Sequence, residues 1–376
     1  METAAGRRRT ATKLKETDRS SNMEKAGIEK RRCDEYLQRA KCELDFSEWL
    51  RTRRSQPGLI VSQGFEERSV GIIERLAETN TEVPSVVINR YLDPYYGEIN
   101  SKYQDRFERA AEKIAAGHWH LVENDYDGQW VYKAVKLIDT EEVIIDITAI
   151  SNRGLFCALD AIAASGKKIW IAYTEAKEYW PKESDWKQLS KEISGYKTLA
   201  DIVDEKPWLS GYQHRVELIP MHEGYDSARS GRALIGFLTF KRARLAAVLG
   251  EEDYEECLFI AGRPRLHQNQ WRLTALKKIN ESLIKEWPVK TMDTFGYLKT
   301  LKQLSSLLLR DESLLARYNV HLAPMGSKLQ TVGSWILSSI VPSITMVASV
   351  PSRYYPKAFS DGIGANWIFP LTLPKK

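Results

Sequence analysis

IIDITAISNR at residues 144–153 and NVHLAPMGSK at residues 319–328 are the two stretches that decide the fold. Each begins with a short apolar run, continues into small residues and ends in a single cation, Arg153 or Lys328. An amphipathic segment and a second apolar run follow in both places. The two stretches therefore predict two copies of one unit, in which a strand leads through a loop into a helix.

Further paired features occur in the same order along the chain. Pro181 and Pro356 have the same spacing as Arg153 and Lys328. The other pairs are Gly64-Phe65 with Gly236-Phe237, Arg90 with Arg263, and Asp125…Gly128 with Asp293…Gly296. An ordered series of such pairs is typical of internal repetition, so the sequence predicts a tandem duplication.

Short, continuous apolar runs alternate with segments of helical periodicity in both halves of the chain. Strands are predicted at 59–62, 85–89, 119–123, 143–147 and 169–173, and then at 216–219, 233–236, 257–261, 320–322 and 344–348. Helices are predicted at 70–78, 103–116, 130–137, 154–164, 241–249, 270–285 and 297–309. Continuous apolar strands are typical of parallel sheets that are covered on both faces. The predicted fold class is α/β, with two tandem Rossmann-like units whose sheets are mainly parallel.

The predicted domains follow the changes in composition. They are a disordered tail (1–22), a helical arm (23–57), the first Rossmann-like unit (58–183), a linker (184–212) and the second Rossmann-like unit (213–376). The tail is small, charged and without apolar periodicity, whereas the arm has apolar residues at helical spacing. Near the end, Asp361–Gly364 is predicted as a turn and Asn366–Phe369 as an edge strand. We expect the two units to face one another about a pseudo-two-fold axis.

The positive charge of the chain is concentrated at its beginning. The net charge is +5, and residues 1–54 hold 15 basic against 10 acidic side chains, so the rest is nearly neutral. This excludes a globally basic nucleic-acid surface, although the basic arm itself could contact nucleic acid or a protein partner. The alternative for the arm is packing against the domain that follows.

Neither a secretory signal nor a membrane span is predicted. The first residues lack an apolar core, and their acidic side chains argue against a transit peptide. The apolar stretch Val332–Val350 contains five serines and Pro342, so a core helix followed by a buried strand is the better interpretation. The four cysteines show no CxxC spacing, which is typical of a reducing cytosol, and the predicted location is cytoplasmic.

Ligands of open parallel sheets lie beyond the carboxyl ends of the strands. The loops after the first and fourth strands are therefore the expected ligand loops. They are Gln63–Ser69 and Thr148–Gly154 in the first unit, and Phe237–Lys241 and Ala323–Lys328 in the second. The predicted ligand-binding residues are Gly64, Ser151, Asn152, Arg153, Gly326, Ser327 and Lys328.

Arg153 and Lys328 carry this prediction because both lie at the start of a predicted helix. A cation there is mildly destabilising unless an anion arrives, and the free amides of a helix N-terminus favour a phosphate. The small residues would let the ligand approach the backbone. The alternative is that the two cations have no ligand.

The strand, the loop with Asn152-Arg153 or Gly326-Ser327-Lys328, and the helix that follows resemble the CRISPR-associated Rossmann fold (CARF) sensor family. The resemblance is good at Gly326-Ser327-Lys328 and loose at Ser151-Asn152-Arg153. It implies binding of cyclic or linear oligoadenylates across a two-fold axis, here within one chain. Such sensors usually carry a nuclease or transcription-factor domain, and nothing after Pro370 resembles one. The resemblance therefore implies a separate effector protein or an output through the arm.

Other residues allow a catalytic interpretation. Asp146 with Glu175 and Lys177 resembles the carboxylate–lysine set of metal-dependent nucleases, although a whole predicted helix separates them. Glu66 and Glu67 could act as general acid or base on a glycosidic bond. His118 and His120 share a strand face but have no third ligand at metal spacing, so neither a metal nor a bound cofactor is predicted.

Aromatic residues follow several predicted strands and could stack on a base. They are Tyr91, Tyr95, Tyr96, Trp180, Tyr354 and Tyr355. The function predicted from the sequence is a nucleotide-binding sensor, in a prokaryotic antiviral defence system, that binds a phosphate-containing and conceivably cyclic nucleotide between the units. The alternative is an enzyme that acts on a nucleotide or nucleic acid.

Overall fold

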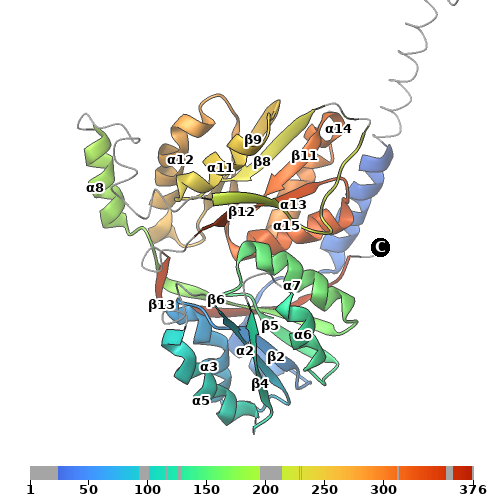
Figure 1. The fold of residues 1–376 in the computed structure, drawn as a ribbon, viewed down its shortest axis with the longest axis vertical. Helices are drawn as coiled ribbons and strands as arrows, with labels where there is room; N and C mark the ends of the chain where they lie inside the picture. The colour runs from blue at the N-terminus through green and yellow to red at the C-terminus, as the bar shows by residue number, and fades with distance from the viewer. Residues whose placement is uncertain are drawn as a thin grey trace, which may run out of the picture.

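The computed structural model describes residues 24–92, 101–115, 117–124, 129–194, 214–227, 229, 231–310, 313–352 and 359–374. The predicted disordered tail, the Asp125…Gly128 segment, and Tyr95, Tyr96, Tyr354, Tyr355 and Pro356 lie outside these residues. In the described residues two α/β units lie one above the other along the long axis of the molecule (Figure 1).

The first unit has a seven-stranded sheet in the order β1-β13-β6-β5-β2-β3-β4. Its parallel strands are β2 (Gly58–Ser62), β3 (Val86–Tyr91), β4 (Trp119–Asn124), β5 (Glu142–Asp146) and β6 (Lys168–Tyr179). All five residues of β2 are buried, which explains why the sequence shows an uninterrupted apolar run there. Antiparallel β13 (Ser360–Leu371) pairs with the outer side of β6.

The second unit has a six-stranded sheet in the order β10-β9-β8-β11-β12-β7. Its strands are β7 (His214–Leu218), β8 (Arg232–Phe237), β9 (Glu256–Arg263), β10 (Val289–Asp293), β11 (Asn319–Ala323) and β12 (Thr345–Pro351). Counted from the first parallel strand of each unit, both sheets have the order 3-2-1-4-5, and an antiparallel strand flanks the fifth strand in each. The α/β fold class is confirmed, and the shared order agrees with the predicted duplication.

Helices connect the parallel strands and cover both faces of each sheet. The first unit has α3 (Gly71–Glu78) and α5 (Gln104–Ala115) on one face, and α6 (Trp130–Lys136) and α7 (Asn152–Ala164) on the other. The second unit has α11 (Arg242–Glu251), α12 (Trp271–Ile284), α13 (Tyr297–Leu308), α14 (Leu314–Arg317) and α15 (Lys328–Ile340). The stretch at 332–350 is a core helix followed by a strand, as predicted, and none of the described helices meets the length and hydropathy of a membrane span.

The two units pack through α7 and α15, which are the helices that follow the fourth strand of each unit. Asp160 on α7 accepts a hydrogen bond from the indole of Trp335 on α15 at 2.8 Å. The same carboxylate lies 3.2 Å from Nε2 of His222, whose Nδ1 is 2.9 Å from the hydroxyl of Ser338 on α15. Buried polar groups with partners on both units fix the relative position of these helices.

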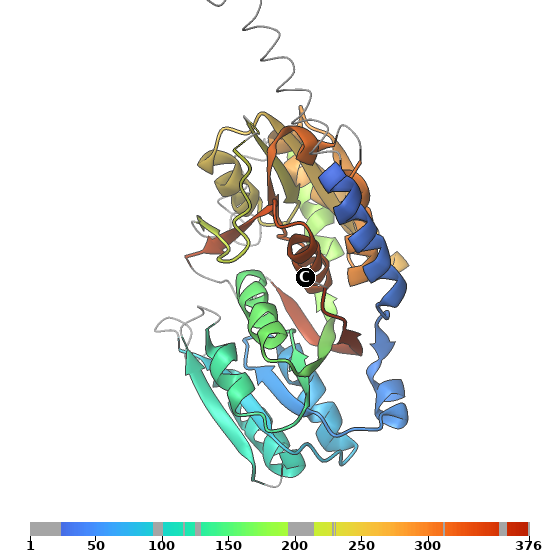
Figure 2. The same ribbon diagram turned by 90° about the vertical axis from the view of Figure 1, so that its right-hand side faces the viewer.

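Both ends of the chain fasten the units together. The arm consists of a helix at residues 24–39, β1 (Leu44–Asp45) and α2 (Phe46–Thr52). Its first helix lies against the second unit, while β1 and α2 reach the first (Figure 2). Cys33 and Tyr36 are buried there, and the Tyr36 hydroxyl donates to the carbonyl of Thr372 at 2.7 Å. The arm therefore packs on the body of the protein, and contact of its exposed basic face with nucleic acid stays a prediction.

Two predicted segments differ from the structure. The strand predicted near the C-terminus exists, but it is longer, includes the predicted turn and belongs to the first sheet, where it lies between β1 and β6. Pairing between distant segments leaves no local signal, which is why sequence placed it in the second unit. The predicted linker includes a helix, α8 (Glu183–Ser194), whose Leu189 packs on Ile279 of α12.

Candidate functional site

A cavity of about 910 Å³ lies between the two units. The first unit contributes the loops after β2 and β5 together with a two-stranded ribbon. This ribbon forms because β6 continues past its last pairing with β5, at Ala172, with only β13 beside it as far as Tyr179. The second unit contributes the loops after β8, β9, β11 and β12. These are the carboxyl ends of the parallel strands, where ligands of such sheets bind.

The described lining of the cavity is strongly cationic. The second unit contributes six basic side chains, namely Arg215, Lys241, Arg244, Arg265, Arg272 and Lys328, and no acidic ones. The first unit contributes the basic Arg68, Arg153 and Lys177 and the acidic Glu66 and Glu175. Nine cations thus face two carboxylates. A surplus of this size in a cavity focuses the electrostatic field on an anion.

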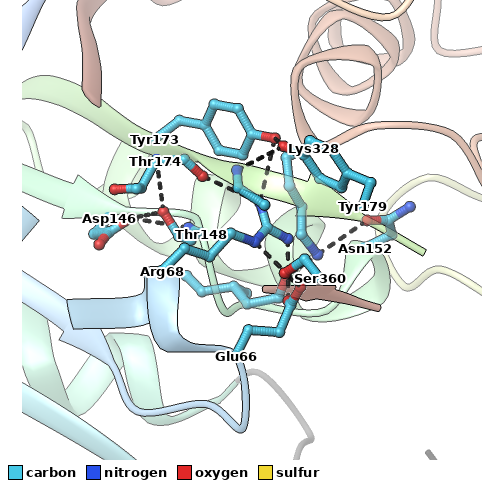
Figure 3. Close-up of polar contacts among 12 residues, drawn as sticks. Glu66, Arg68, Asp146, Thr148, Asn152, Tyr173, Thr174, Tyr179, Lys328 and Ser360 are labelled. Atoms are coloured by element: carbon cyan, nitrogen blue, oxygen red, sulfur yellow. Dashed lines mark hydrogen bonds and ion pairs between the residues drawn. The ribbon is translucent and has the colours of Figure 1, made fainter. Parts of the chain in front are cut away.

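Lys328 lies where the two units meet. It is the first residue of α15, and its ammonium donates to the carbonyl of Ile150 and to Oδ1 of Asn152, the latter at 3.2 Å (Figure 3). Asn152 in turn donates to the carbonyls of Pro324 and Gly326, at 3.0 and 3.3 Å. Burial, together with the charges of Arg68 and Arg244, lowers the pKa of Lys328 to about 7, in spite of the opposing charge of Glu66. An anion beside this ammonium would restore its protonated form.

The two predicted loop cations are not at equivalent positions. Ser151 and Ser327 are the N-caps of α7 and α15, and each side chain accepts a hydrogen bond from the backbone amide three residues on. The residue after each cap is Asn152 in the first unit and Lys328 in the second, so these two correspond. The pairing of Arg153 with Lys328 predicted from sequence is therefore wrong by one residue. Arg153 lines the cavity too, and it forms an ion pair with Glu217 on β7.

Glu66 and Arg68 form a buried ion pair beside Lys328. The guanidinium donates to both carboxylate oxygens of Glu66, at 3.0 and 3.2 Å, and to the carbonyl of Thr174 at 3.1 Å. Ser360 donates to the same carboxylate. Burial raises the pKa of Glu66, but Arg68 and Ser360 outweigh this effect, so the pKa is below its ordinary value and the group is an anion. Figure 3 shows this ion pair close to Lys328 and under the rings of Tyr173 and Tyr179.

A second group of cations lies at the start of α11 and on α12. The ammonium of Lys241 lies 3.6 Å from the ring centroid of Phe359, and burial with the neighbouring charge of Arg244 lowers its pKa to about 7. Arg272 lies over the ring of Phe240 at 4.5 Å, and burial lowers its pKa to about 10. Its guanidinium donates to the backbone carbonyls of residues 179, 180 and 181, which hold it without neutralising its charge.

The remaining predicted carboxylates are held by other groups. Glu175 lines the cavity but forms an ion pair with Arg265 at 2.8 Å and accepts from the indole of Trp367 at 2.9 Å. Glu67 does not line the cavity and pairs with Arg106 at 2.9 Å. Within the described ranges, no group of three or more His, Cys, Asp or Glu side chains is arranged to hold a metal.

Asp146 is buried beneath the site, with 1% exposure, and does not line the cavity. Its Oδ1 accepts from the backbone and the hydroxyl of Thr148, whereas its Oδ2 has no hydrogen-bond partner. Burial raises the pKa of Asp146 to about 7, against the opposing effects of Thr148 and Arg68. The carboxyl supports the loop after β5, because Thr148 also accepts from the amide of Thr174 on β6.

The glycines serve the packing of loops. A Cβ on Gly64 would lie 2.8 Å from Cβ of Ala149, so this glycine lets the loops after β2 and β5 touch, and it does not line the cavity. A Cβ on Gly326 would lie 2.1 Å from Oε1 of Gln330. Gln330 and Ser327 form a capping box at the start of α15, and Gly326, Ser327 and Lys328 all line the cavity.

The sequence did not single out Arg244, Arg265 or Arg272 as site residues, and it placed Arg68 only within the predicted loop Gln63–Ser69. Arg244 had a recognisable signal, since three cations occur in the sequence Lys241-Arg242-Ala243-Arg244 at a predicted helix start. Arg272 had none, because a single arginine within a helix is ordinary. Of the predicted aromatic residues in the described part of the chain, Trp180 lines the cavity and Tyr91 does not.

Comparison with known proteins leaves the family open. No protein-family model and no curated protein matches the sequence. Among solved structures, the chain is similar to a type III CRISPR defence DNA nuclease activated by cyclic oligoadenylate, with 11% identity and a TM-score of 0.46 over 75% of this chain and 64% of that one. It is also similar to the cytoplasmic domain of a prokaryotic cation chloride cotransporter, with 9% identity and a TM-score of 0.26 over 79% of this chain and 96% of that one. This chain thus spans less than two thirds of the nuclease, and the low identities and TM-scores assign it no function.

Proposed function

We propose that this protein binds a phosphate-containing nucleotide in the cavity between its two units and acts as a nucleotide sensor. The observation that carries the proposal is the charge of the described lining, where nine cations face two carboxylates. Desolvated cations without matching anions are costly, and a bound phosphate offsets that cost. Lys241, Arg272 and Lys328 all have lowered pKa values for this reason.

The lining also suits the bases of a nucleotide. Phe240, Phe295, Phe359, Tyr179 and Trp180 all line the cavity among the arginines and lysines. Aromatic faces and guanidinium planes stack on bases, at about 1–3 kcal/mol per base. The volume of about 910 Å³ is at the upper end of the range for small-molecule sites, roughly 300–1,000 Å³, and favours a ligand larger than one nucleotide.

A sensor needs a way to report that its ligand has bound. The ligand and the other unit compete for the ammonium of Lys328, because this ammonium donates to Ile150 and Asn152 of the other unit. A phosphate that draws Lys328 away would weaken one interunit contact and supply another. From the resemblance of the Gly326-Ser327-Lys328 loop we further propose a role in prokaryotic antiviral defence, with a separate effector protein as the recipient of the signal.

The test is mass spectrometry of small molecules released from the purified protein, followed by calorimetry against a panel of nucleotides. We expect a nucleotide that binds stoichiometrically and whose affinity falls at least about tenfold, or 1.4 kcal/mol, in Lys328→Ala. Lys278→Ala is the matched control, since Lys278 is an exposed lysine on α12 outside the cavity. Binding that is unchanged in Lys328→Ala would refute the proposed site, and conversion of the nucleotide to products would favour an enzyme instead.

A further inference from the structure

The two units contribute charge to the cavity very unequally. In the described lining, the second unit supplies six basic and no acidic side chains, whereas the first supplies three basic and two acidic ones. Among the six, Lys328 contacts Asn152, Arg265 pairs with Glu175, Arg215 pairs with Glu217, and Arg272 donates to backbone carbonyls. A ligand with two-fold symmetry would meet very different fields at its two halves.

The start of α11 concentrates the surplus charge of the second unit. Lys241 is the N-cap residue, Arg242 and Arg244 follow, and no acidic residue occupies the first turn of this ten-residue helix. Cations at a helix N-terminus are unfavourable by about 0.3–1 kcal/mol each, since they face the positive end of the helix dipole. Free amides and cations at one place make a strong anion site.

Contacts with neutral groups hold Lys241, and also Arg272 on the neighbouring helix α12, in position. Lys241 lies over the ring of Phe359, and Arg272 lies over Phe240 while donating to three backbone carbonyls. Across the described residues neither forms an ion pair with a carboxylate. Phe240 adjoins Lys241 in sequence and carries Arg272 on its ring, so both cations border the same part of the cavity.

We infer that the nucleotide is asymmetric, and that its terminal phosphate binds at the second unit between Lys241, Arg244 and Arg272. This inference rests on the proposed function. A terminal phosphomonoester carries about −1.5 to −2 charges at neutral pH, more than the single charge of an internal phosphodiester, so it is the group that matches this cluster. The more neutral surface formed by the first unit then faces the rest of the ligand.

The test compares three ligands of the same bases and length by calorimetry: a linear oligonucleotide with a 5′-phosphate, the same oligonucleotide with a free 5′-hydroxyl, and the cyclic form. We expect the 5′-phosphorylated ligand to bind at least about tenfold more tightly than the other two, because the charge-assisted hydrogen bonds of a phosphomonoester are strong. AMP, ADP and ATP, tested in parallel, show whether a terminal phosphate on a mononucleotide is sufficient.

Variants of the cluster should remove the preference for the terminal phosphate. The ratio to compare is the affinity for the 5′-phosphorylated linear oligonucleotide divided by that for the 5′-hydroxyl form. We expect this ratio to fall close to one in Lys241→Gln and to stay at its wild-type value in Lys241→Arg. Lys177→Gln is the matched control, because Lys177 is a cavity lysine of the first unit, and it should leave the ratio unchanged. Arg244→Gln provides a second variant if Lys241→Gln fails to fold.

The possible outcomes separate the two proposals. Cyclic and 5′-phosphorylated ligands that bind equally well would overturn the inference and leave the proposed function standing. A ratio unchanged in both Lys241→Gln and Arg244→Gln would do the same. Wild-type protein that binds no nucleotide would overturn the proposed function, and the inference with it.

Discussion

Asn152 and Lys328 are the first residues of corresponding helices in the two units, and they contact each other, with 3.2 Å between Nζ and Oδ1. Asn152 also donates to two carbonyls of the loop that leads into Lys328. The two ligand loops predicted after the fourth strands are thus in direct polar contact with each other. A molecule bound near Lys328 in the cavity would lie beside this contact or replace it.

Replacing Asn152 should loosen the contact between the units. Asn152→Ala removes the hydrogen bonds to Pro324 and Gly326 and one acceptor of Lys328, and buried carbonyls without donors cost about 1–3 kcal/mol. We expect a loss of roughly 2 kcal/mol of stability, measured as a lower melting temperature. Gln188→Ala, at an exposed amide on α8, should leave the melting temperature unchanged. An Asn152→Ala protein as stable as the wild type would show that this contact contributes little.

Nucleotide affinity should fall as the pH rises through 7. Lys241 and Lys328 both have pKa values of about 7, and an anion binds their protonated forms. Affinity is therefore highest below pH 7, and above it falls by up to about tenfold per pH unit for each lysine that must take up a proton. Calorimetry in buffers of different ionisation enthalpy measures that uptake directly. The ligand for this test should contain internal phosphodiesters only, because a terminal phosphate would itself titrate in this range. An affinity that does not change between pH 6 and 9 would contradict the role of Lys241 and Lys328 in binding.

Lys241→Met should stabilise the protein without ligand while weakening nucleotide binding. Because the pKa of Lys241 is lower in the folded than in the unfolded state, protonation at lower pH costs stability, and that cost disappears as the pH rises from about 7 towards the ordinary value of 10.5. The gain should therefore be larger at pH 6 than at pH 10. For a chain of this length, a gain of about 1 kcal/mol raises the melting temperature by roughly 1–2 °C. Lys278→Met on the exposed side of α12 should give no gain, and a destabilised Lys241→Met protein would show that the lysine is already neutralised.

Asp146→Asn should make stability less dependent on pH. The pKa of Asp146 is raised from 3.8 to about 7, so the folded protein holds a proton between these values that the unfolded chain has lost. Wild-type stability therefore falls as the pH rises from about 4 to 7, where the buried carboxyl becomes charged. We expect the advantage of Asp146→Asn over wild type to be larger at pH 8 than at pH 5 by at least about 1 kcal/mol. Equal differences at both pH values would mean that Asp146 does not titrate in this range.

The parallel strands could be predicted from sequence because they are buried on both faces. β2 is an uninterrupted apolar or small run, and β5 and β11 are almost entirely buried. The observed bounds of all three lie within about two residues of the predicted ones. β10 was not predicted, because it is an edge strand in which only Met292 is fully buried. A half-exposed strand of this kind gives no continuous apolar run.

The cavity could be predicted only in part. Small residues and a cation after the fourth strand were visible in sequence, and Ser151, Asn152, Arg153, Gly326, Ser327 and Lys328 all line the cavity. Arg68 lies in the predicted loop Gln63–Ser69 but was not singled out, whereas Arg272 could not be foreseen, since its position depends on carbonyls at the end of a distant strand. Contacts between segments far apart in sequence leave no local pattern.

The pairing of β13 with β6 makes the second unit an insertion within the first. The chain leaves the first sheet after β6, builds the whole second unit and returns to lay β13 along β6. Residues 58–194 alone would thus expose the long edge of β6, and such an edge invites aggregation. During synthesis β13 follows the whole second unit. The β6–β13 ribbon that borders the cavity can therefore form only once the second unit has been synthesised.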